Sequence, residues 1–155
     1  MPIKLNLGAG HSVIEGFTPI DRKLGSEVYP LAYVNDFADE IRASHVLEHF
    51  PQAAILEILR EWIRVLKPGG LLKIAVPDFN FAIRHREHPH FEGWVMGGQS
   101  DENDFHMTLF TRGKLLYYFQ ALGLEDIQDW QSEIKDCASL PVSLNLCGRK
   151  PRAAK

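Results

Sequence analysis

Apolar and polar side chains alternate over residues 3–7, and the alternation stops at two closely spaced glycines, Gly8 and Gly10. A two-residue period is typical of a half-buried strand. Glycine has no Cβ, so it accepts positive φ and lets a ligand approach the backbone closely. The pattern predicts a strand that ends in a sharp turn with accessible backbone, although a plain turn needs no ligand.

A second short apolar segment, Pro19-Ile20, ends at the acid Asp21. Residues 11–18 are too few for a normal crossover helix, so we expect the first helix to be truncated. A carboxylate at the tip of a second strand can accept hydrogen bonds from two ribose hydroxyls. Asp21 follows Gly10 by 11 residues, whereas a dinucleotide-binding fingerprint has about 20. The role of a simple turn residue therefore stays open for Asp21.

The middle of the chain predicts a strand, a helix and a strand in that order. Residues 22–38 read as a loop that contains one short strand at Glu27–Tyr29. Asp39–Ser44 is the next predicted strand, and Pro51 suits the first position of a long amphipathic helix. Leu71–Val76 is a nearly continuous apolar run, typical of a strand buried on both faces. This order implies a parallel strand pair with a right-handed crossover.

The last part of the chain predicts a long loop, a helix and two strands. Residues 77–110 look irregular, which is usual for a lid or substrate loop that follows a buried parallel strand. Thr111 can cap a helix that ends at Gly123. The strands predicted at Glu125–Trp130 and Val142–Cys147 have no helical pattern between them, so we expect them to pair antiparallel.

Composition supports one globular domain over residues 1–150, with a tail at 151–155. The 155 residues are 45% hydrophobic and 24% charged, and the formal charge is -3. Without clustered basic residues, no nucleic-acid partner is expected. No apolar run approaches the roughly 20 residues that span a bilayer, and no signal-peptide pattern begins the chain, so we expect a cytoplasmic protein without a membrane partner. Cys137 and Cys147 lack metal-ligand spacing, and no metal site is predicted.

Four segments together carry a resemblance to a known family. They are Leu5-Asn6-Leu7-Gly8-Ala9-Gly10 with the acid Asp21, Ala43-Ser44-His45-Val46-Leu47-Glu48-His49, Arg64-Val65-Leu66-Lys67-Pro68-Gly69-Gly70, and Val76-Pro77-Asp78. They resemble the class I S-adenosylmethionine-dependent methyltransferases, most closely the small methyltransferase type 11 proteins that begin directly at the glycine motif. The resemblance implies an α/β, three-layer, Rossmann-like fold with a mostly parallel sheet, an antiparallel last strand and a truncated first helix.

The resemblance also implies S-adenosylmethionine as cofactor, bound at the carboxyl ends of the parallel strands. The implied cofactor positions are, by moiety, Gly8, Ala9 and Gly10 at the methionine part, Asp21 at the ribose, Glu27 and Val28 beside the adenine, and Ser44 and His45 facing the sulfonium methyl. Many members of the family have an acid at the position of Asn6. Any contact from Asn6 to the cofactor ammonium would therefore lack the negative charge of a carboxylate. The missing helices leave the cofactor face less covered, and the 77–110 loop or a homodimer could close it.

Methyl transfer requires alignment of an acceptor with the sulfonium and exclusion of water. A hydroxyl acceptor would gain from a base, and histidine titrates near neutral pH. His106 is the first candidate base, followed by His45, with Asp78 as an alternative. The sequence predicts a small-molecule acceptor and does not name it.

Two alternatives to a methyltransferase remain at this point. Because the missing helices leave so little cover over the cofactor face, the chain could be a binding or regulatory subunit that retains the fold without catalysis. His45-Val46-Leu47-Glu48-His49 also fits the H-x-x-E-H pattern of a zinc hydrolase, in which two histidines share one face of a long helix. That segment lies between a strand and a proline-started helix, which disfavours the zinc hydrolase.

Overall fold

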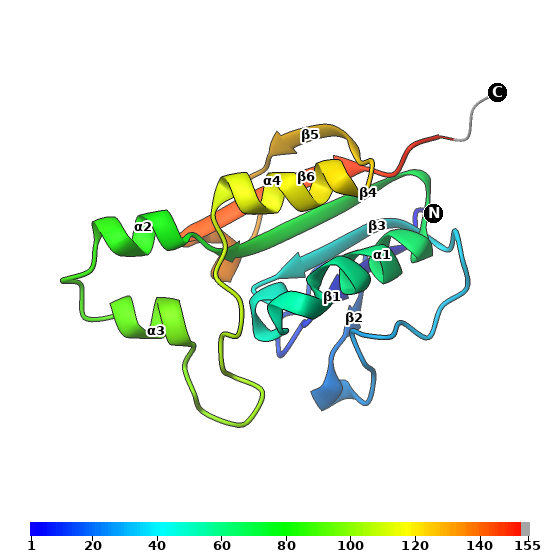
Figure 1. Cartoon of the computed structure of the whole chain (residues 1–155). Helices are drawn as coiled ribbons and strands as arrows, with labels where there is room; N and C mark the ends of the chain where they lie inside the picture. Colours follow the sequence, from blue (N-terminus) through cyan, green and yellow to red (C-terminus); the bar gives the residue numbers. More distant parts are fainter. Residues whose placement is uncertain (153–155) are drawn as a thin grey trace.

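A six-stranded sheet runs through the protein, for which the computed structural model describes residues 1–152 (Figure 1). Its strand order is β2-β1-β3-β4-β6-β5. The strands are β1 (Lys4–Leu7), β2 (Phe17–Ile20), β3 (Ala38–Ser44), β4 (Leu66–Pro77), β5 (Glu125–Asp129) and β6 (Ser143–Arg149). The first four strands pair parallel, whereas β6 pairs antiparallel with both β4 and β5. The predicted sheet, with its antiparallel last strand, is confirmed.

The first helix is truncated, as predicted, because only turns connect β1 to β2. The strand predicted at Glu27–Tyr29 is wrong, since this segment forms bends and no ladder. Its polar groups bond instead to the helix that follows in the chain: Trp62 Nε1–H donates to the Val28 carbonyl over 2.8 Å, and the Tyr29 hydroxyl donates to Glu57 over 2.7 Å. Glu27 and Val28 therefore do not lie at the tip of a third strand.

Helix α1 (Ile55–Val65) fills the crossover between β3 and β4. Two short 3-10 turns, η2 (Leu47–His49) and η3 (Gln52–Ala54), precede it, so Pro51 opens a 3-10 turn and not the α-helix itself. The buried side chains of α1 recur at helical spacing, and they are Ile55, Ile58, Leu59, Trp62 and Val65. This apolar stripe packs on the sheet and anchors the crossover.

Two six-residue helices, α2 (Phe79–Arg84) and α3 (Phe91–Met96), interrupt the stretch that looked irregular in the sequence. Asp78 caps α2 by accepting a hydrogen bond from the Asn80 N–H over 3.0 Å. Aromatic contacts hold the helix pair together, including Phe81 against Trp94 with ring centroids 5.7 Å apart. The residues that follow, 97–110, remain an extended loop and are called the lid below.

The two faces of the sheet differ in polarity. Helices α1 and α4 (Arg112–Ala121) both lie in front of the sheet in Figure 1, over a continuous apolar core. The opposite face carries polar side chains from neighbouring strands, namely Lys4, Asn6, Glu40, Arg42 and Lys73. Segment 130–142 covers this polar face, and Trp130 lies over Arg42 and Lys73. The third layer is therefore a largely non-helical segment.

Replacing Phe119 of α4 with alanine should lower the free energy of unfolding by about 3–5 kcal/mol, because the ring is fully buried and its loss leaves a cavity. Tyr117 lies on the same helix but is 66% exposed, so Tyr117→Ala is a matched control with an expected change within about 0.5 kcal/mol. Urea denaturation followed by circular dichroism measures both. Equal effects of the two variants would contradict the packing of α4.

Candidate cofactor site

The turn after β1 requires glycine at its first position. Gly8 has φ of 65°, and a Cβ there would lie 2.2 Å from Cγ2 of Val46. Its N–H donates to the carbonyl of Ile20 over 2.8 Å, which joins the ends of β1 and β2. Gly10 also has positive φ, of 54°, but a Cβ at this position would meet no atom within 4 Å. The backbone at Gly10 therefore borders open space at the carboxyl edge of the sheet.

Asp21 holds this turn in place. Its Oδ2 accepts a hydrogen bond from the Gly10 N–H over 2.8 Å, and its Oδ1 accepts from the Lys23 N–H over 2.8 Å. The second bond caps the 3-10 turn η1 (Arg22–Leu24). Because each carboxylate oxygen has two lone pairs, both still have acceptor capacity. The turn role considered from the sequence is thus observed, and it leaves lone pairs on both carboxylate oxygens.

Asn6 belongs to a buried polar network on the face that segment 130–142 covers. Its Oδ1 accepts a hydrogen bond from Arg42 Nη1 over 3.3 Å, and Arg42 also forms a buried ion pair with Asp136. Burial would raise the pKa of Asp136, but hydrogen bonds from Arg42 and Ser132 more than offset this and hold it below its usual value. The side-chain oxygen of Asn6 is therefore bonded to protein.

Ser44 and His45 follow β3, as predicted, but their side chains have different surroundings. The Ser44 hydroxyl is buried beside Asp136, whose pKa it helps to lower, and it makes no hydrogen bond of normal geometry among residues 1–152. His45 has φ of 54°, and its Nε2 lies 2.9 Å from the Ser143 hydroxyl. Because that hydroxyl donates to Asn145 Oδ1 over 2.7 Å, it accepts from His45 Nε2–H. Burial above all, and then nearby His106, lower the pKa of His45 to about 4, so the ring is neutral at neutral pH.

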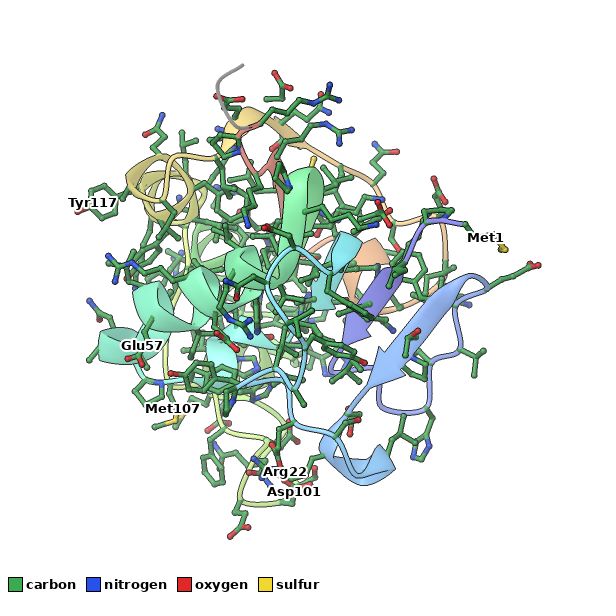
Figure 2. The ribbon with its side chains drawn as sticks, turned by 90° about the vertical axis from the view of Figure 1, so that its right-hand side faces the viewer. Met1, Arg22, Glu57, Asp101, Met107 and Tyr117 are labelled. Atoms are coloured by element: carbon green, nitrogen blue, oxygen red, sulfur yellow. The ribbon has the colours of Figure 1, made fainter. Side chains whose placement is uncertain are left out.

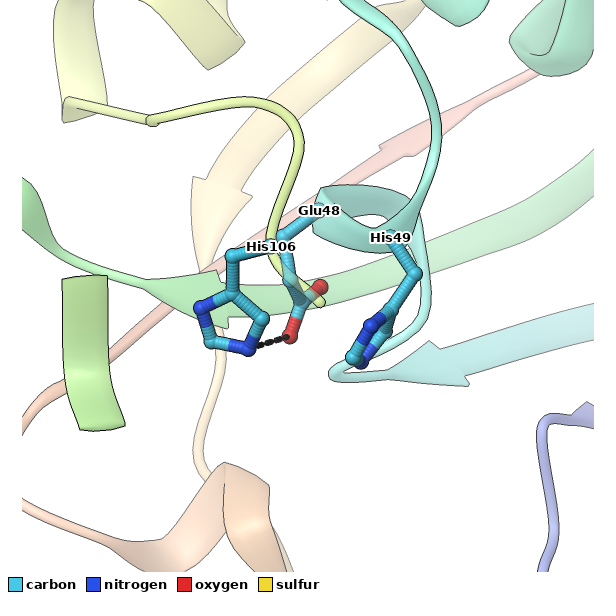
Figure 3. Close-up of side chains that lie close together, drawn as sticks. All are labelled: Glu48, His49 and His106. Atoms are coloured by element: carbon cyan, nitrogen blue, oxygen red, sulfur yellow. Dashed lines mark ion pairs between the residues drawn. The ribbon is translucent and has the colours of Figure 1, made fainter. Parts of the chain in front are cut away.

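His106 lies beside Glu48 and His49, two residues that the sequence analysis considered only within the zinc hydrolase pattern (Figure 3). Its Nε2 is 3.9 Å from Glu48 Oε1, and the rings of His49 and His106 are 5.0 Å apart. Both carboxyl oxygens of Glu48 are buried without a hydrogen-bond partner in the described part of the chain. Burial raises the pKa of this carboxyl to about 8 and lowers the pKa of His106. The H-x-x-E-H pattern at residues 45–49 was the available sequence signal for Glu48 and His49.

The zinc hydrolase alternative fails on the local geometry. His45 immediately follows β3, whereas His49 ends the three-residue turn η2. The long helix that would align both imidazoles on one face is not formed, and His45 instead contacts Ser143 of β6. The H-x-x-E-H pattern therefore arises from a strand end followed by a 3-10 turn.

The lid crosses the carboxyl edge of the sheet. At its return, the N–H groups of Met107 and Thr108 donate to the Glu48 carbonyl over 2.8 and 3.2 Å. At its tip, Arg22 Nη1 of η1 donates to Asn103 Oδ1 over 2.5 Å. Figure 2 shows the two segments meeting, with Arg22 labelled on one and Asp101 on the other. The lid thus contacts both the η1 turn beside Asp21 and the η2 turn that follows β3.

Asp78 lies at the carboxyl end of β4 and lines an open surface cavity of about 550 Å³. Ser143 and Asn145 of β6 also line this cavity, and Trp130 closes another side. Because Ser143 also bonds to His45, the cavity adjoins the end of β3. The cavity therefore brings one predicted catalytic residue, Asp78, close to the partner of another, His45.

No helix within residues 1–152 has both the length and the apolar composition needed to cross a bilayer.

Comparison with known proteins agrees with this geometry. A family model described as a methyltransferase domain matches residues 17–129. The chain therefore belongs to the methyltransferase domain family, as a class I, S-adenosylmethionine-dependent member, and S-adenosylmethionine is its cofactor. No curated protein matches the chain.

Solved structures share the fold at low sequence identity. A SAM-dependent methyltransferase from Archaeoglobus fulgidus is 14% identical with a TM-score of 0.66, over 96% of this chain and 86% of that one. A SAM-dependent methyltransferase from Methanosarcina mazei is 15% identical with a TM-score of 0.65, over 97% and 93% of the two chains. The 1,6-didemethyltoxoflavin-N1-methyltransferase of Burkholderia thailandensis, solved with S-adenosylhomocysteine, is 18% identical with a TM-score of 0.62, over 97% and 71%.

The close approach of Val46 to Gly8 gives a test of the turn. Gly8→Ala should destabilise the protein by about 1–3 kcal/mol, because the new methyl group both clashes with Val46 and occupies positive φ. Gly10→Ala has the same φ cost without the clash, so its effect should be smaller. Gly8→Ala should cost less stability in a Val46→Ala background than in the unmodified protein, because the smaller side chain removes the clash. Thermal unfolding measures all four variants, and equal effects at both glycines would exclude the clash.

Proposed function

We propose that this protein transfers a methyl group from S-adenosylmethionine to a small-molecule acceptor. The observation that carries the proposal is the edge formed by β1, β2 and β3, where the open backbone at Gly10, the carboxylate of Asp21 and the buried hydroxyl of Ser44 belong to neighbouring strand ends. Carboxyl ends of parallel strands are where such sheets bind ligands.

Each residue at this edge has a role that its chemistry permits. The Gly8-Ala9-Gly10 backbone would lie against the methionine part, and Asp21 would accept hydrogen bonds from ribose hydroxyls with the lone pairs that the turn leaves free. Ser44 would donate or accept a hydrogen bond near the sulfonium. When bound, the cofactor supplies an activated methyl group.

The adenine contacts of Glu27 and Val28 stay a prediction, although their place on the chain supports it. Glu27 pairs with Arg22 over 3.5 Å, and Arg22 lies on η1 directly after Asp21. The pair thus keeps the 27–28 segment near the proposed ribose position. Asn6 is a weaker candidate for cofactor contact, because its side-chain oxygen already bonds to Arg42.

The acceptor would occupy the 550 Å³ cavity beside Asp78. Asp78 Oδ1 caps α2, which leaves Oδ2 available to accept a hydrogen bond from an acceptor hydroxyl and to take its proton. His45 suits positioning better than proton transfer, since its Nε2–H bonds to Ser143 at the cavity wall. A catalytic role for His106 stays a prediction and would require the acceptor to reach across the lid.

Closure of the site would rest on the lid, whose tip reaches η1 through Arg22 and Asn103. A homodimer that covers the same face stays a prediction. The protein's expected location in the cytoplasm is likewise a prediction.

A non-catalytic binding or regulatory subunit is the second candidate function, favoured by the truncated first helix, since only turns connect β1 to β2 beside the proposed cofactor position. Radiolabelled methyl transfer separates the two. Protein incubated with methyl-tritiated S-adenosylmethionine and a filtered small-molecule extract should label the low-mass fraction, and Asp78→Ala should reduce that label at least tenfold. Label only in the protein fraction would contradict a small-molecule acceptor, and no label despite cofactor binding would favour the binding subunit.

Asp21→Ala should weaken binding of S-adenosylhomocysteine by about 1.5–3 kcal/mol, roughly 10- to 150-fold, as expected for lost hydrogen bonds to a charged group. Isothermal titration calorimetry measures it, with micromolar affinity expected for the unmodified protein. Asp21→Asn retains an oxygen for the turn and should lie in between. Glu15→Ala, an exposed carboxylate in the same connection, is the control. Unchanged affinity in Asp21→Ala would rule out the ribose contact.

A further inference from the structure

Glu48 is the one fully buried acid whose two carboxyl oxygens both lack a hydrogen-bond partner in the described residues. A buried polar group without a partner is costly, and such groups in folded proteins usually have an ion or water nearby. The methyl-transfer proposal gives Glu48 no role. The burial of its carboxyl group without a partner therefore requires a separate explanation.

The imidazoles of His49 and His106 lie beside this carboxyl group with their ring planes 77° apart (Figure 3). A third imidazole, that of His45, also lies close, with its Nδ1 3.4 Å from Glu48 Oε1. His49 Nδ1 lies 3.1 Å from the Phe105 carbonyl, and His106 Nδ1 lies 3.1 Å from the Trp94 carbonyl. A carbonyl only accepts, so each Nδ1 carries the hydrogen and each Nε2 of the neutral ring keeps a lone pair. A backbone carbonyl behind one ring nitrogen is the usual arrangement that orients a histidine toward a metal.

We propose that Glu48, His49 and His106 bind a divalent transition-metal ion of the zinc class. Their ligand atoms lie within 4.8 Å of one another. Two imidazole nitrogens and one carboxylate oxygen form a set that zinc accepts, with metal–ligand distances of about 2.0–2.2 Å. Closing the set around one ion requires side-chain shifts of about one ångström.

The backbone around the cluster is already fixed from both sides. The Glu48 carbonyl accepts from the Met107 and Thr108 N–H groups, and the Thr108 hydroxyl donates to the Phe50 carbonyl over 2.7 Å. These bonds hold the lid return against η2, so the backbone that carries His106 stays beside Glu48 while the side chains adjust. Three protein ligands leave a fourth position for water or for an oxygen of another molecule.

This ligand set differs from the zinc hydrolase pattern and from the sequence expectation of no metal. His45, the first histidine of H-x-x-E-H, is bonded to Ser143, and its place is taken by His106 from the lid. His106 becomes a metal ligand in this assignment and not a base. The exposed His88 and His90 have rings 5.4 Å apart, but no acid completes a ligand set with them. They are therefore a matched control.

Zinc titration of the complete chain tests the proposal. Protein is stripped with a chelator, returned to metal-free buffer and titrated with zinc ion against a fluorescent competitor, with bound zinc counted by atomic emission. One zinc per chain is expected. His49→Ala and His106→Ala should each weaken zinc affinity by more than about 100-fold, because loss of a residue behind a ligand already costs about 10- to 100-fold.

Glu48→Gln keeps the side-chain shape and should also weaken zinc binding, and circular dichroism checks that each variant is folded. The double variant His88→Ala/His90→Ala should bind zinc as the unmodified protein does. No zinc bound by the folded protein, or binding lost only in the His88/His90 variant, would overturn the proposal. Calorimetry with S-adenosylhomocysteine on the same stripped protein measures cofactor binding in the absence of zinc. A failed zinc titration would therefore leave the proposed methyl transfer standing.

Discussion

The buried ion pair between Arg42 and Asp136 determines how the carboxyl-terminal part of the chain covers the sheet. Arg42 projects from the central strand β3 onto the face that carries no helix in the described residues. An unpaired charge there would be strongly destabilising. Asp136 and the ring of Trp130 together hold segment 130–142 over that face. The same segment leads into Ser143, which meets His45 and lines the cavity.

The lid contacts both the proposed cofactor site and the proposed metal site at one edge of the sheet. Its tip contacts η1, next to the carboxylate that ties the glycine turn, and its return supplies His106 to Glu48. The cofactor side and the proposed metal site thus share one loop. A change in how that loop lies would be felt at both places, because its return is bonded to the backbone of η2 and its tip to a side chain of η1.

The sequence predicted best where short-range pattern determines structure. The glycine turn, α1 and the parallel pair of β3 with β4 followed from periodicity, although β4 begins at Leu66 and so includes Pro68-Gly69-Gly70. Glu27–Tyr29 looked like a strand, but its bonds to Trp62 and Glu57 depend on tertiary contacts. Helices of six residues are too short to give a clear period. Glu48 and His106 come together only because of the path of the lid, and no local sequence pattern encodes that path.

One of the two edge strands, β2, limits how copies of the protein can associate at that edge. Ile20 bonds toward β1 through its carbonyl, so the alternating backbone directs Pro19 to the outer side of the strand. Proline has no amide hydrogen to offer there, and the strand is only four residues long. Short strands and edge prolines discourage a second sheet from adding on. Copies of this protein that met at the β2 edge would have to join through side-chain surfaces, because a continuous sheet shared across β2 has no donor at its centre.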